Sequence, residues 1–186
     1  ASFREKNPLV RYQIYSGNSE NIKERIERGI LDFGLMVEPD DISRYDSISM
    51  PVKERWGVWV REDSELAGKD VVEPKDLWNY PLISGRGEAL QSRIRKWFGE
   101  YYDQLEIVVS GNLLYNQAIM AQDKIGVVFG IELECTYQGL RFLPLAPSVE
   151  SATVLTWKKN QILSAATASF LNHVETCINS ISDHEL

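Results

Sequence analysis

The sequence lacks the long apolar runs and the basic clusters that mark membrane-spanning and nucleic-acid-binding chains. None of its 186 residues belongs to an apolar run of about 18, the length that a spanning helix needs. No charged segment followed by an apolar stretch opens the chain, so we expect no secretory signal, no membrane contact and a cytoplasmic location. The formal net charge is -7. Because neutralising phosphates needs a clustered basic surface, we expect no nucleic-acid contact by this segment itself.

Cysteine and histidine are also scarce, with two of each. Cys135 and Cys177 have neither CxxC spacing nor a framework of several pairs, which indicates unpaired thiols in a reducing compartment. His173 and His184 lie in or beyond the last predicted helix, and the motifs HExxH, GxSxG and GxxxxGK[ST] do not occur. We therefore predict that the chain is not an enzyme and has no catalytic residue, no metal site and no cofactor.

The pattern that the sequence does contain is an alternation of strands and helices. Residues 9–15 alternate apolar and polar side chains and predict a strand, and residues 33–37 form a short apolar run typical of a buried parallel strand. Further strands are predicted at residues 56–61, 81–84, 105–109, 125–129, 141–145 and 152–157, and helices at residues 19–28, 74–77, 89–98, 113–122 and 164–181. Strand–helix–strand units of this length predict the α/β class, with mostly parallel sheets flanked by helices.

Three of the predicted strands end in nearly the same tripeptide before a helix. The tripeptides are Ser16-Gly17-Asn18, Ser84-Gly85-Arg86 and Ser110-Gly111-Asn112. A helix N-terminus carries unpaired N–H groups and a partial positive charge, and glycine lets the backbone approach a ligand. Such turns at the carboxyl ends of strands predict a cleft for a small polar or anionic molecule, in which Arg86 could clamp a carboxylate. The alternative is that the turns only cap helices and that Arg86 points into solvent.

Further motifs follow one another in an order that resembles a known family. They are Leu31-Asp32-Phe33-Gly34-Leu35, Trp56-Gly57-Val58, Asp63-Ser64-Glu65-Leu66-Ala67, Pro74-Lys75-Asp76-Leu77, Pro81-Leu82-Ile83 and Asp123-Lys124-Ile125-Gly126-Val127-Val128. The first is similar to the leucine-aspartate-x-glycine-isoleucine strand entry of LysR-type transcriptional regulators. The others resemble that family's crossing strand, its serine-x-leucine-alanine turn, the proline-leucine-isoleucine segment and a late glycine-isoleucine strand. Over nearly its whole length the chain resembles the effector-binding domain of these regulators.

The resemblance implies a two-lobed fold like that of the type-2 periplasmic binding proteins, with two crossing strands as a hinge. Lobe one would comprise residues 1–57 plus 151–186, and lobe two residues 58–150. A small effector would bind between the lobes. Carried over residue by residue, the expected site consists of Ser16, Asn18, Ser84, Arg86, Asn112, Val128 and Phe129. The family's opening strand and its N-terminal winged helix-turn-helix domain would precede residue 1.

The function implied by the resemblance is ligand sensing within a DNA-binding transcriptional regulator. A polar or carboxylate effector would shift the population of lobe arrangements, and DNA would be bound through the helix-turn-helix domain outside this chain. The resemblance implies a homodimer or tetramer. We predict that Ile94, Trp97 and Phe98, on the apolar face of the helix at residues 89–98, form part of the dimer interface. The alternative is that this face covers the chain's own sheet.

Two other function classes share the implied scaffold. One is the solute-binding protein of a transport system, which the upstream coding sequence would distinguish by a signal peptide in place of a helix-turn-helix. The other is an enzyme on the same two lobes, such as a prephenate dehydratase-like protein. An enzyme would need an acid or base in the cleft, and turnover of candidate substrates would reveal it.

Overall fold

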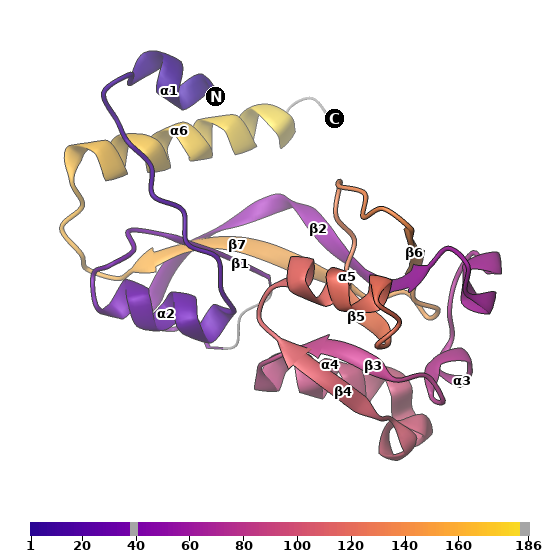
Figure 1. Ribbon diagram of the computed structural model, residues 1–186. Coiled ribbons are helices and arrows are strands. Elements are labelled where there is room, and N and C mark those ends of the chain that lie inside the picture. The colour runs from indigo at the N-terminus through magenta and orange to yellow at the C-terminus, as the bar shows by residue number, and fades with distance from the viewer. Residues whose placement is uncertain (38–40, 183–186) are drawn as a thin grey trace. The chain divides into compact units, whose positions relative to one another are not determined.

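The computed structural model describes residues 1–37 and 41–182, which divide into two compact units. The first unit is Ala1–Val52 together with Ala152–Leu186, and the second is Lys53–Ser151. Strands β2 (Tyr45–Arg61) and β7 (Glu150–Lys158) each run across a boundary between the units, so the chain crosses twice on extended backbone (Figure 1).

The first unit is built on a strand pair with helices packed against it. Strand β1 pairs antiparallel with β7, and Met36 packs with Ile22, Ile26 and Tyr45 in a buried cluster. Helix α1 lies along α6, where the ring centroids of Phe3 and Phe170 are 5.3 Å apart (Figure 1). The remaining elements of this unit are α1 (Ser2–Lys6), α2 (Ser19–Glu27), β1 (Gly34–Val37) and α6 (Ala165–Ser182).

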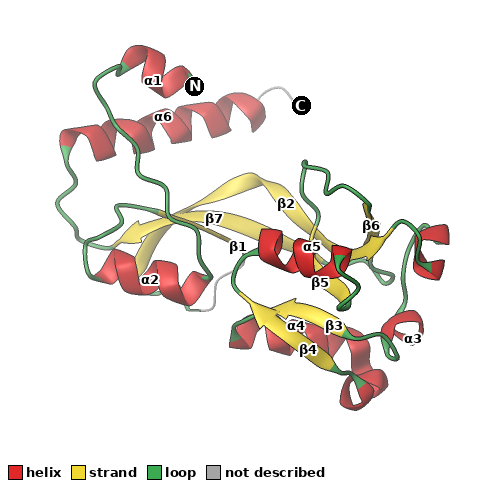
Figure 2. Cartoon of the chain, in the orientation of Figure 1, coloured by secondary structure: helices red, strands yellow, loops and turns green. Residues whose placement is uncertain are grey.

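The second unit has a mixed sheet with helices against it (Figure 2). Strand β3 pairs in parallel with β4 and β5, whereas β2 pairs antiparallel with β5 and β6. Besides its part of β2, the unit contains η1 (Glu65–Gly68), α3 (Pro74–Leu77), β3 (Leu82–Gly85), α4 (Glu88–Phe98), η2 (Gly99–Gln104), β4 (Ile107–Gly111), α5 (Leu114–Gln122), β5 (Val127–Ile131) and β6 (Leu140–Pro144). The predicted α/β class is confirmed, but the pairing is mixed and not mostly parallel.

Two of the predicted strands differ in the structure. Residues 9–15 form no strand, and Leu9 and Ile14 are 94% and 93% exposed. A strand needs a neighbour to take up its backbone hydrogen bonds, and none of the described strands pairs with this segment. The strand predicted as buried and parallel at residues 33–37 is β1, which is antiparallel to β7 and buries only one of its faces.

The apolar face of α4 packs inside the second unit. Ile94, Trp97 and Phe98 are all buried, and Trp97 donates its indole N–H to the backbone oxygen of Pro147 at 3.1 Å. The Phe98 ring lies 6.1 Å from that of Phe129 on β5. The prediction that this face forms a dimer interface is therefore wrong, because these side chains cover the unit's own sheet.

Among the described residues, no helix is long and apolar enough to cross a membrane.

Candidate functional site

Two of the three predicted turns meet in the second unit. Because β3 and β4 are parallel neighbours, their ends lie in register, with Ser84 opposite Ser110 and Gly85 opposite Gly111. The backbone N–H of Arg86 donates to the Gly111 oxygen at 3.0 Å, and its side-chain Nε donates to Ser110 Oγ at 3.3 Å. The sequence therefore places Arg86 and a serine from the neighbouring turn at one edge of the sheet, where ligands of open α/β sheets bind.

Two glutamines donate hydrogen bonds to the first of these turns. Gln117 of α5 donates its amide to the backbone oxygen of Ser84 at 2.9 Å, and Gln91 of α4 donates to Ser84 Oγ at 3.3 Å and to the Gly85 oxygen at 3.4 Å. The Ser84 hydroxyl in turn donates to the Gly85 oxygen at 3.0 Å. Ser84 is buried, so its hydroxyl serves the turn and does not face solvent. Neither glutamine was predicted from the sequence.

Hydrogen-bond donors remain exposed around this edge. Arg86 and Asn112 are both exposed. Helix α4 begins after Gly87, whose φ of 122° favours glycine, and neither this position nor Leu113 before α5 caps its helix with a side chain. The first N–H groups of both helices therefore have no side-chain cap, and they give the edge a partial positive charge.

The remaining predicted residues of the second unit, Val128 and Phe129, are in its core. Strand β5 lies between β2 and β3, and both of its faces are covered. Val128 belongs to a buried cluster with Trp59 and Ile83, while the Phe129 ring lies 5.9 Å from that of Trp56. The resemblance implied that these two side chains line the effector site, but in the structure both are buried in the core of the unit.

The third predicted turn, Ser16-Gly17-Asn18, belongs to the first unit. Asn18 is the N-cap of α2, and its Oδ1 accepts from the backbone N–H of Asn21 at 2.9 Å. This is the capping role that stood as the alternative. Ser16 is exposed, and the Arg25 guanidinium lies 3.9 Å from the centroid of the neighbouring Tyr15 ring.

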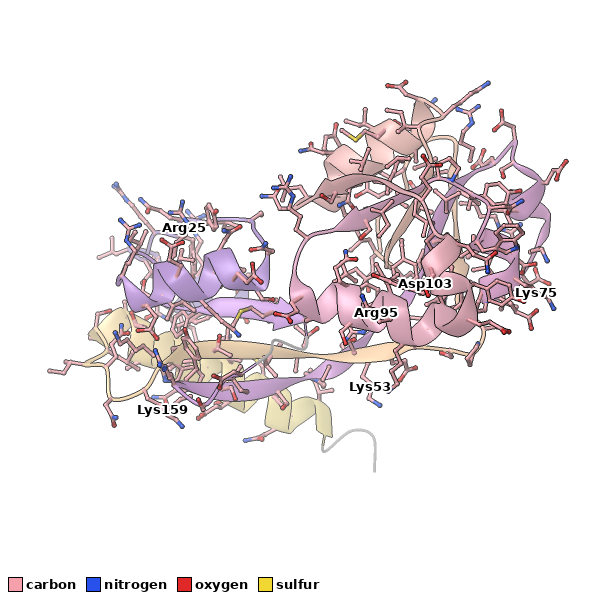
Figure 3. All side chains as sticks on the ribbon, turned by 90° about the horizontal axis from the view of Figure 1, so that it is seen from below. Arg25, Lys53, Lys75, Arg95, Asp103 and Lys159 are labelled. Atoms are coloured by element: carbon pink, nitrogen blue, oxygen red, sulfur yellow. The ribbon has the colours of Figure 1, made fainter. Side chains whose placement is uncertain are left out.

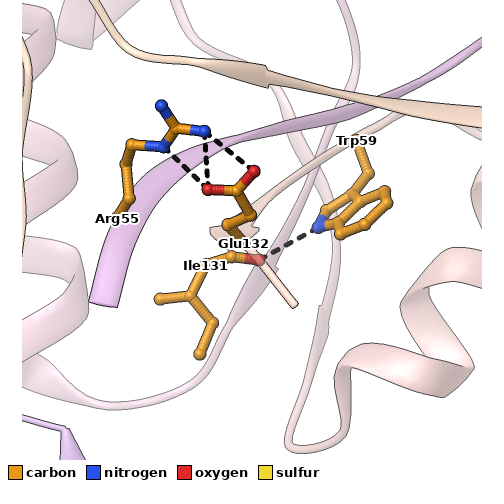
Figure 4. Close-up of polar contacts among 4 residues, drawn as sticks. All are labelled: Arg55, Trp59, Ile131 and Glu132. Carbon is orange, nitrogen blue, oxygen red and sulfur yellow. Dashed lines mark hydrogen bonds and ion pairs between the residues drawn. The ribbon is translucent and has the colours of Figure 1, made fainter. Parts of the chain in front are cut away.

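An ion pair fixes the end of β5 to β2. Arg55 donates through Nε and a terminal nitrogen to the two carboxylate oxygens of Glu132, at 2.7 and 2.8 Å (Figure 4). In the same region Trp59 donates its indole N–H to the Ile131 oxygen at 3.0 Å. Both charged side chains are partly exposed, so the pair stabilises the fold by no more than about 1 kcal/mol. Glu132 is thereby engaged in structure and not placed as an acid or base.

A shallow depression of the second unit, about 460 Å³ in volume, is also polar. Arg61, the one cationic side chain among its lining residues, donates to Asp63 and to the backbone oxygen of Gln122. The hydrogen bond from Arg61 holds the pKa of Asp63 below its usual value. Arg61 and Asp63 therefore pair with each other, and Glu62 adds a second carboxylate to the lining.

The few groups with chemical reactivity have structural partners. His173 lies on α6, and its Nε2 is 2.9 Å from Ser2 Oγ of α1 and 3.6 Å from Cys177 Sγ on the next turn of α6. Cys135 is exposed, and burial together with this neighbouring thiol raises the pKa of Tyr137. His184 lies outside the described residues. Among the residues that are described, no group of three His, Cys, Asp or Glu side chains could hold a metal ion.

Comparison with solved structures identifies the fold. The effector binding domain of QuiR in complex with shikimate superposes with a TM-score of 0.84 at 16% identity, covering 96% of this chain and 88% of that one. The regulatory domain of CcmR from Synechocystis PCC6803 in complex with 2-PG gives a TM-score of 0.80, also at 16% identity, over 95% and 88%. The fold is thus the type-2 periplasmic-binding-like fold of LysR effector-binding domains.

Comparison of sequences identifies the family. The HTH-type transcriptional regulator YwbI of Bacillus subtilis is 26% identical over 94% of this chain and 59% of its own length, so the chain spans less than two thirds of that relative. The model of the LysR substrate binding domain matches residues 1–177. On this match the chain belongs to the LysR substrate binding domain family.

Proposed function

We propose that the chain is the effector-sensing domain of a LysR-type transcriptional regulator and is not an enzyme. It binds a small polar or carboxylate effector, and DNA is contacted by a helix-turn-helix domain outside this chain. The family match over residues 1–177 and the regulator YwbI among the relatives support this reading over a transport protein or an enzyme. The same membership supports a cytoplasmic homodimer or tetramer.

The observation that carries the proposal is the hydrogen bond from Arg86 to Ser110 at the ends of β3 and β4. We propose this edge as one wall of the effector site, with Asn112 beside it. Ser16 and Asn18 of the first unit, and the backbone of Val128 and Phe129, complete the proposed site. QuiR is in complex with shikimate and CcmR with 2-PG, which supports small polar metabolites as the first ligands to test.

In this proposal the two units are the lobes of the sensor, and β2 and β7 are its hinge strands. An effector that binds one lobe arrangement more tightly than the other shifts their populations by its differential affinity. The lobe arrangement is then read by the DNA-binding domain. Ligand binding without turnover is the whole activity that the chain needs.

A thermal-shift titration tests the site. A ligand at about 100 times its dissociation constant stabilises a protein by roughly 2.7 kcal/mol, which raises the melting temperature of a domain of this size by about 5–10 °C. We expect shikimate, 2-PG or a related acid to do so with the wild-type chain, and Arg86→Ala to abolish the shift. The control is Arg95→Ala, because Arg95 lies on α4 against Tyr102 (Figure 3). An undiminished shift in Arg86→Ala contradicts the proposed site, and a broad acid library without any shift contradicts ligand sensing.

A further inference from the structure

The hydrogen-bond acceptors of the β3–α4 turn are occupied from inside the unit. The Ser84 oxygen accepts from Gln117, and the Gly85 oxygen accepts from both Ser84 Oγ and Gln91. The Ser84 hydroxyl oxygen accepts from Gln91. On the neighbouring strand, the Gly111 oxygen accepts from the Arg86 backbone. Each of these acceptors is thus paired with a donor of the same unit, and none needs a ligand to satisfy it.

Hydrogen-bond donors at the same edge, by contrast, remain available to a ligand. Arg86 makes its one described side-chain hydrogen bond through Nε, which leaves the two terminal nitrogens of the guanidinium for another acceptor. Ser110 Oγ accepts that bond and keeps its own hydroxyl proton to donate. Glu88 is the acidic residue in the first turn of α4, and it is exposed, where solvent and salt screen its charge.

The two glutamines are the reason why the acceptors at this edge are paired while its donors stay available. Gln117 is only 4% exposed, and its amide reaches from α5 across to β3, while Gln91 reaches the same turn from α4. A methyl group on Gly111 would come within 3.3 Å of the Gln117 amide nitrogen, so this side chain lies against both turns. The buried amide of Gln117 pairs the Ser84 carbonyl and the half-buried amide of Gln91 pairs the Gly85 carbonyl, and losing such a donor is unfavourable for a carbonyl that water does not reach.

We propose that Gln91 and Gln117 are positioning residues that make this wall selective for small anions, either carboxylates or phosphates, over neutral analogues and amines. The inference rests on the proposed function and names its ligand class. The glutamines act through the turn and touch no ligand. An anion meets the terminal guanidinium nitrogens of Arg86 and the Ser110 hydroxyl as donors, whereas an ammonium group finds the backbone acceptors of the turn already paired and meets the charge of Arg86.

The test compares an acid with its neutral ester. Isothermal calorimetry on the whole chain measures the affinities for shikimate, for methyl shikimate and, separately, for inorganic phosphate. We expect wild type to bind shikimate at least about tenfold more tightly than the ester, the loss typical of one charge-assisted hydrogen bond. Binding of phosphate alone assigns the anion site to phosphates, and binding of shikimate alone assigns it to carboxylates.

Substitution of the glutamines separates positioning from stability. Gln117→Glu and Gln91→Glu replace an amide donor by a carboxylate, so we expect the preference for acid over ester to fall about tenfold or more. Gln91→Met removes the donor without adding charge and should lower the preference in the same direction, even where Gln117→Glu does not fold. The matched control is Gln122→Glu on α5, because Gln122 donates to the Gln138 oxygen and not to either turn.

The outcomes separate anion selection by the glutamines from the proposed function of ligand sensing. Equal affinity of wild type for shikimate and its ester, or an unchanged preference in folded Gln91→Glu and Gln91→Met, overturns anion selection by the glutamines and leaves ligand sensing in place. A wild-type chain that binds none of the three probes overturns anion selection, while ligand sensing itself is decided by the broad acid library. A loss of preference in Gln122→Glu equal to that in Gln91→Glu assigns the effect to added charge and also overturns the inference.

Discussion

A buried hydrogen bond joins β2 and β7 inside the second unit. Trp56 donates its indole N–H to Ser151 Oγ at 2.8 Å, and both residues are buried. Phenylalanine at position 56 would keep the ring contact with Phe129 but leave the Ser151 hydroxyl without its donor. We therefore expect Trp56→Phe to lower the free energy of unfolding by about 1–3 kcal/mol, measured by urea denaturation.

The matched control for this bond is Ser151→Ala, alone and combined with Trp56→Phe. If the loss comes from an unpaired buried group, the double variant is less destabilised than the sum of the single variants. Strict additivity would mean that the hydrogen bond contributes nothing beyond the packing of the indole ring.

Asp76 makes stability depend on pH. Burial acts to raise the pKa of Asp76, but the Glu73 N–H at 3.0 Å and the Lys69 ammonium outweigh it and hold the value below the ordinary 3.8. Near this pKa the unfolded chain therefore binds more protons than the folded chain. The stability that the ionised Asp76 contributes is present above the unfolded pKa and is lost as the pH falls through the folded pKa. We expect wild type to lose more stability than Asp76→Asn between about pH 6 and about pH 3 in urea denaturation.

The control for this pH dependence is Asp103→Asn, because Asp103 is exposed on η2 (Figure 3). Wild type and Asp103→Asn both keep Asp76, so we expect both to lose more stability at low pH than Asp76→Asn does. Identical pH slopes for wild type and Asp76→Asn would contradict the assigned role.

The sequence predicted part of the candidate site, for a physical reason. Ser84 and Arg86 could be placed because a Ser-Gly turn after an apolar strand marks a strand end, and parallel strands put such ends together. Gln117 was missed although a signal was present, since it shares the buried face of α5 with Ala118 and Ala121. A polar residue on an apolar helix face needs a partner, but only the structure names that partner as the Ser84 carbonyl.

At the scale of elements, close packing of β2 requires a glycine. Gly57 lies opposite Gly130 of β5 and Pro144 of β6, and a methyl group there would overlap the Phe142 ring and the backbone oxygen of Leu143. Because a paired backbone oxygen has little room to move, we expect Gly57→Ala to lower the free energy of unfolding by about 1–3 kcal/mol in chemical denaturation.

Gly68, at the end of η1, provides the comparison for Gly57. A methyl group there would meet nothing within 4 Å, so Gly68→Ala should leave stability within about 0.5 kcal/mol of wild type. Equal effects of the two substitutions would show that sheet packing at Gly57 is looser than the structure indicates.

Helices were predicted more closely than strands, and the reason lies in their hydrogen bonds. A helix such as α4 bonds to itself, so its apolar spacing predicts it at residues 89–98, one residue from its observed start at Glu88. A strand depends on a distant partner, which is why residues 9–15 have the pattern without the structure. Strand β2 begins at Tyr45 and not at residue 56. Its first half was missed because it is largely exposed and contains Pro51, although Ile48, Met50 and Val52 have the spacing of a strand.

At the scale of the whole molecule, the chain places a continuous segment, Lys53–Ser151, in one of its two units. The buried cluster around Trp59, Ile83 and Val128 lies wholly within this segment. The same is true of the rings that pack against Phe129, those of Trp56, Trp97 and Phe98. The first unit, by contrast, is assembled from two segments far apart in sequence, and we expect it to fold only when both are present.

This difference predicts that residues 53–151 fold on their own. The cut positions keep the Trp56–Ser151 hydrogen bond and the pairing of β2 with β5 and β6, so the excised segment retains its buried contacts. We expect it to unfold in one cooperative urea transition by tryptophan fluorescence and far-UV circular dichroism. The control is a chain of residues 1–52, which holds α2 and β1 without β7 and should show no cooperative transition. Broad, non-coincident transitions of the 53–151 segment would mean that its core depends on the first unit.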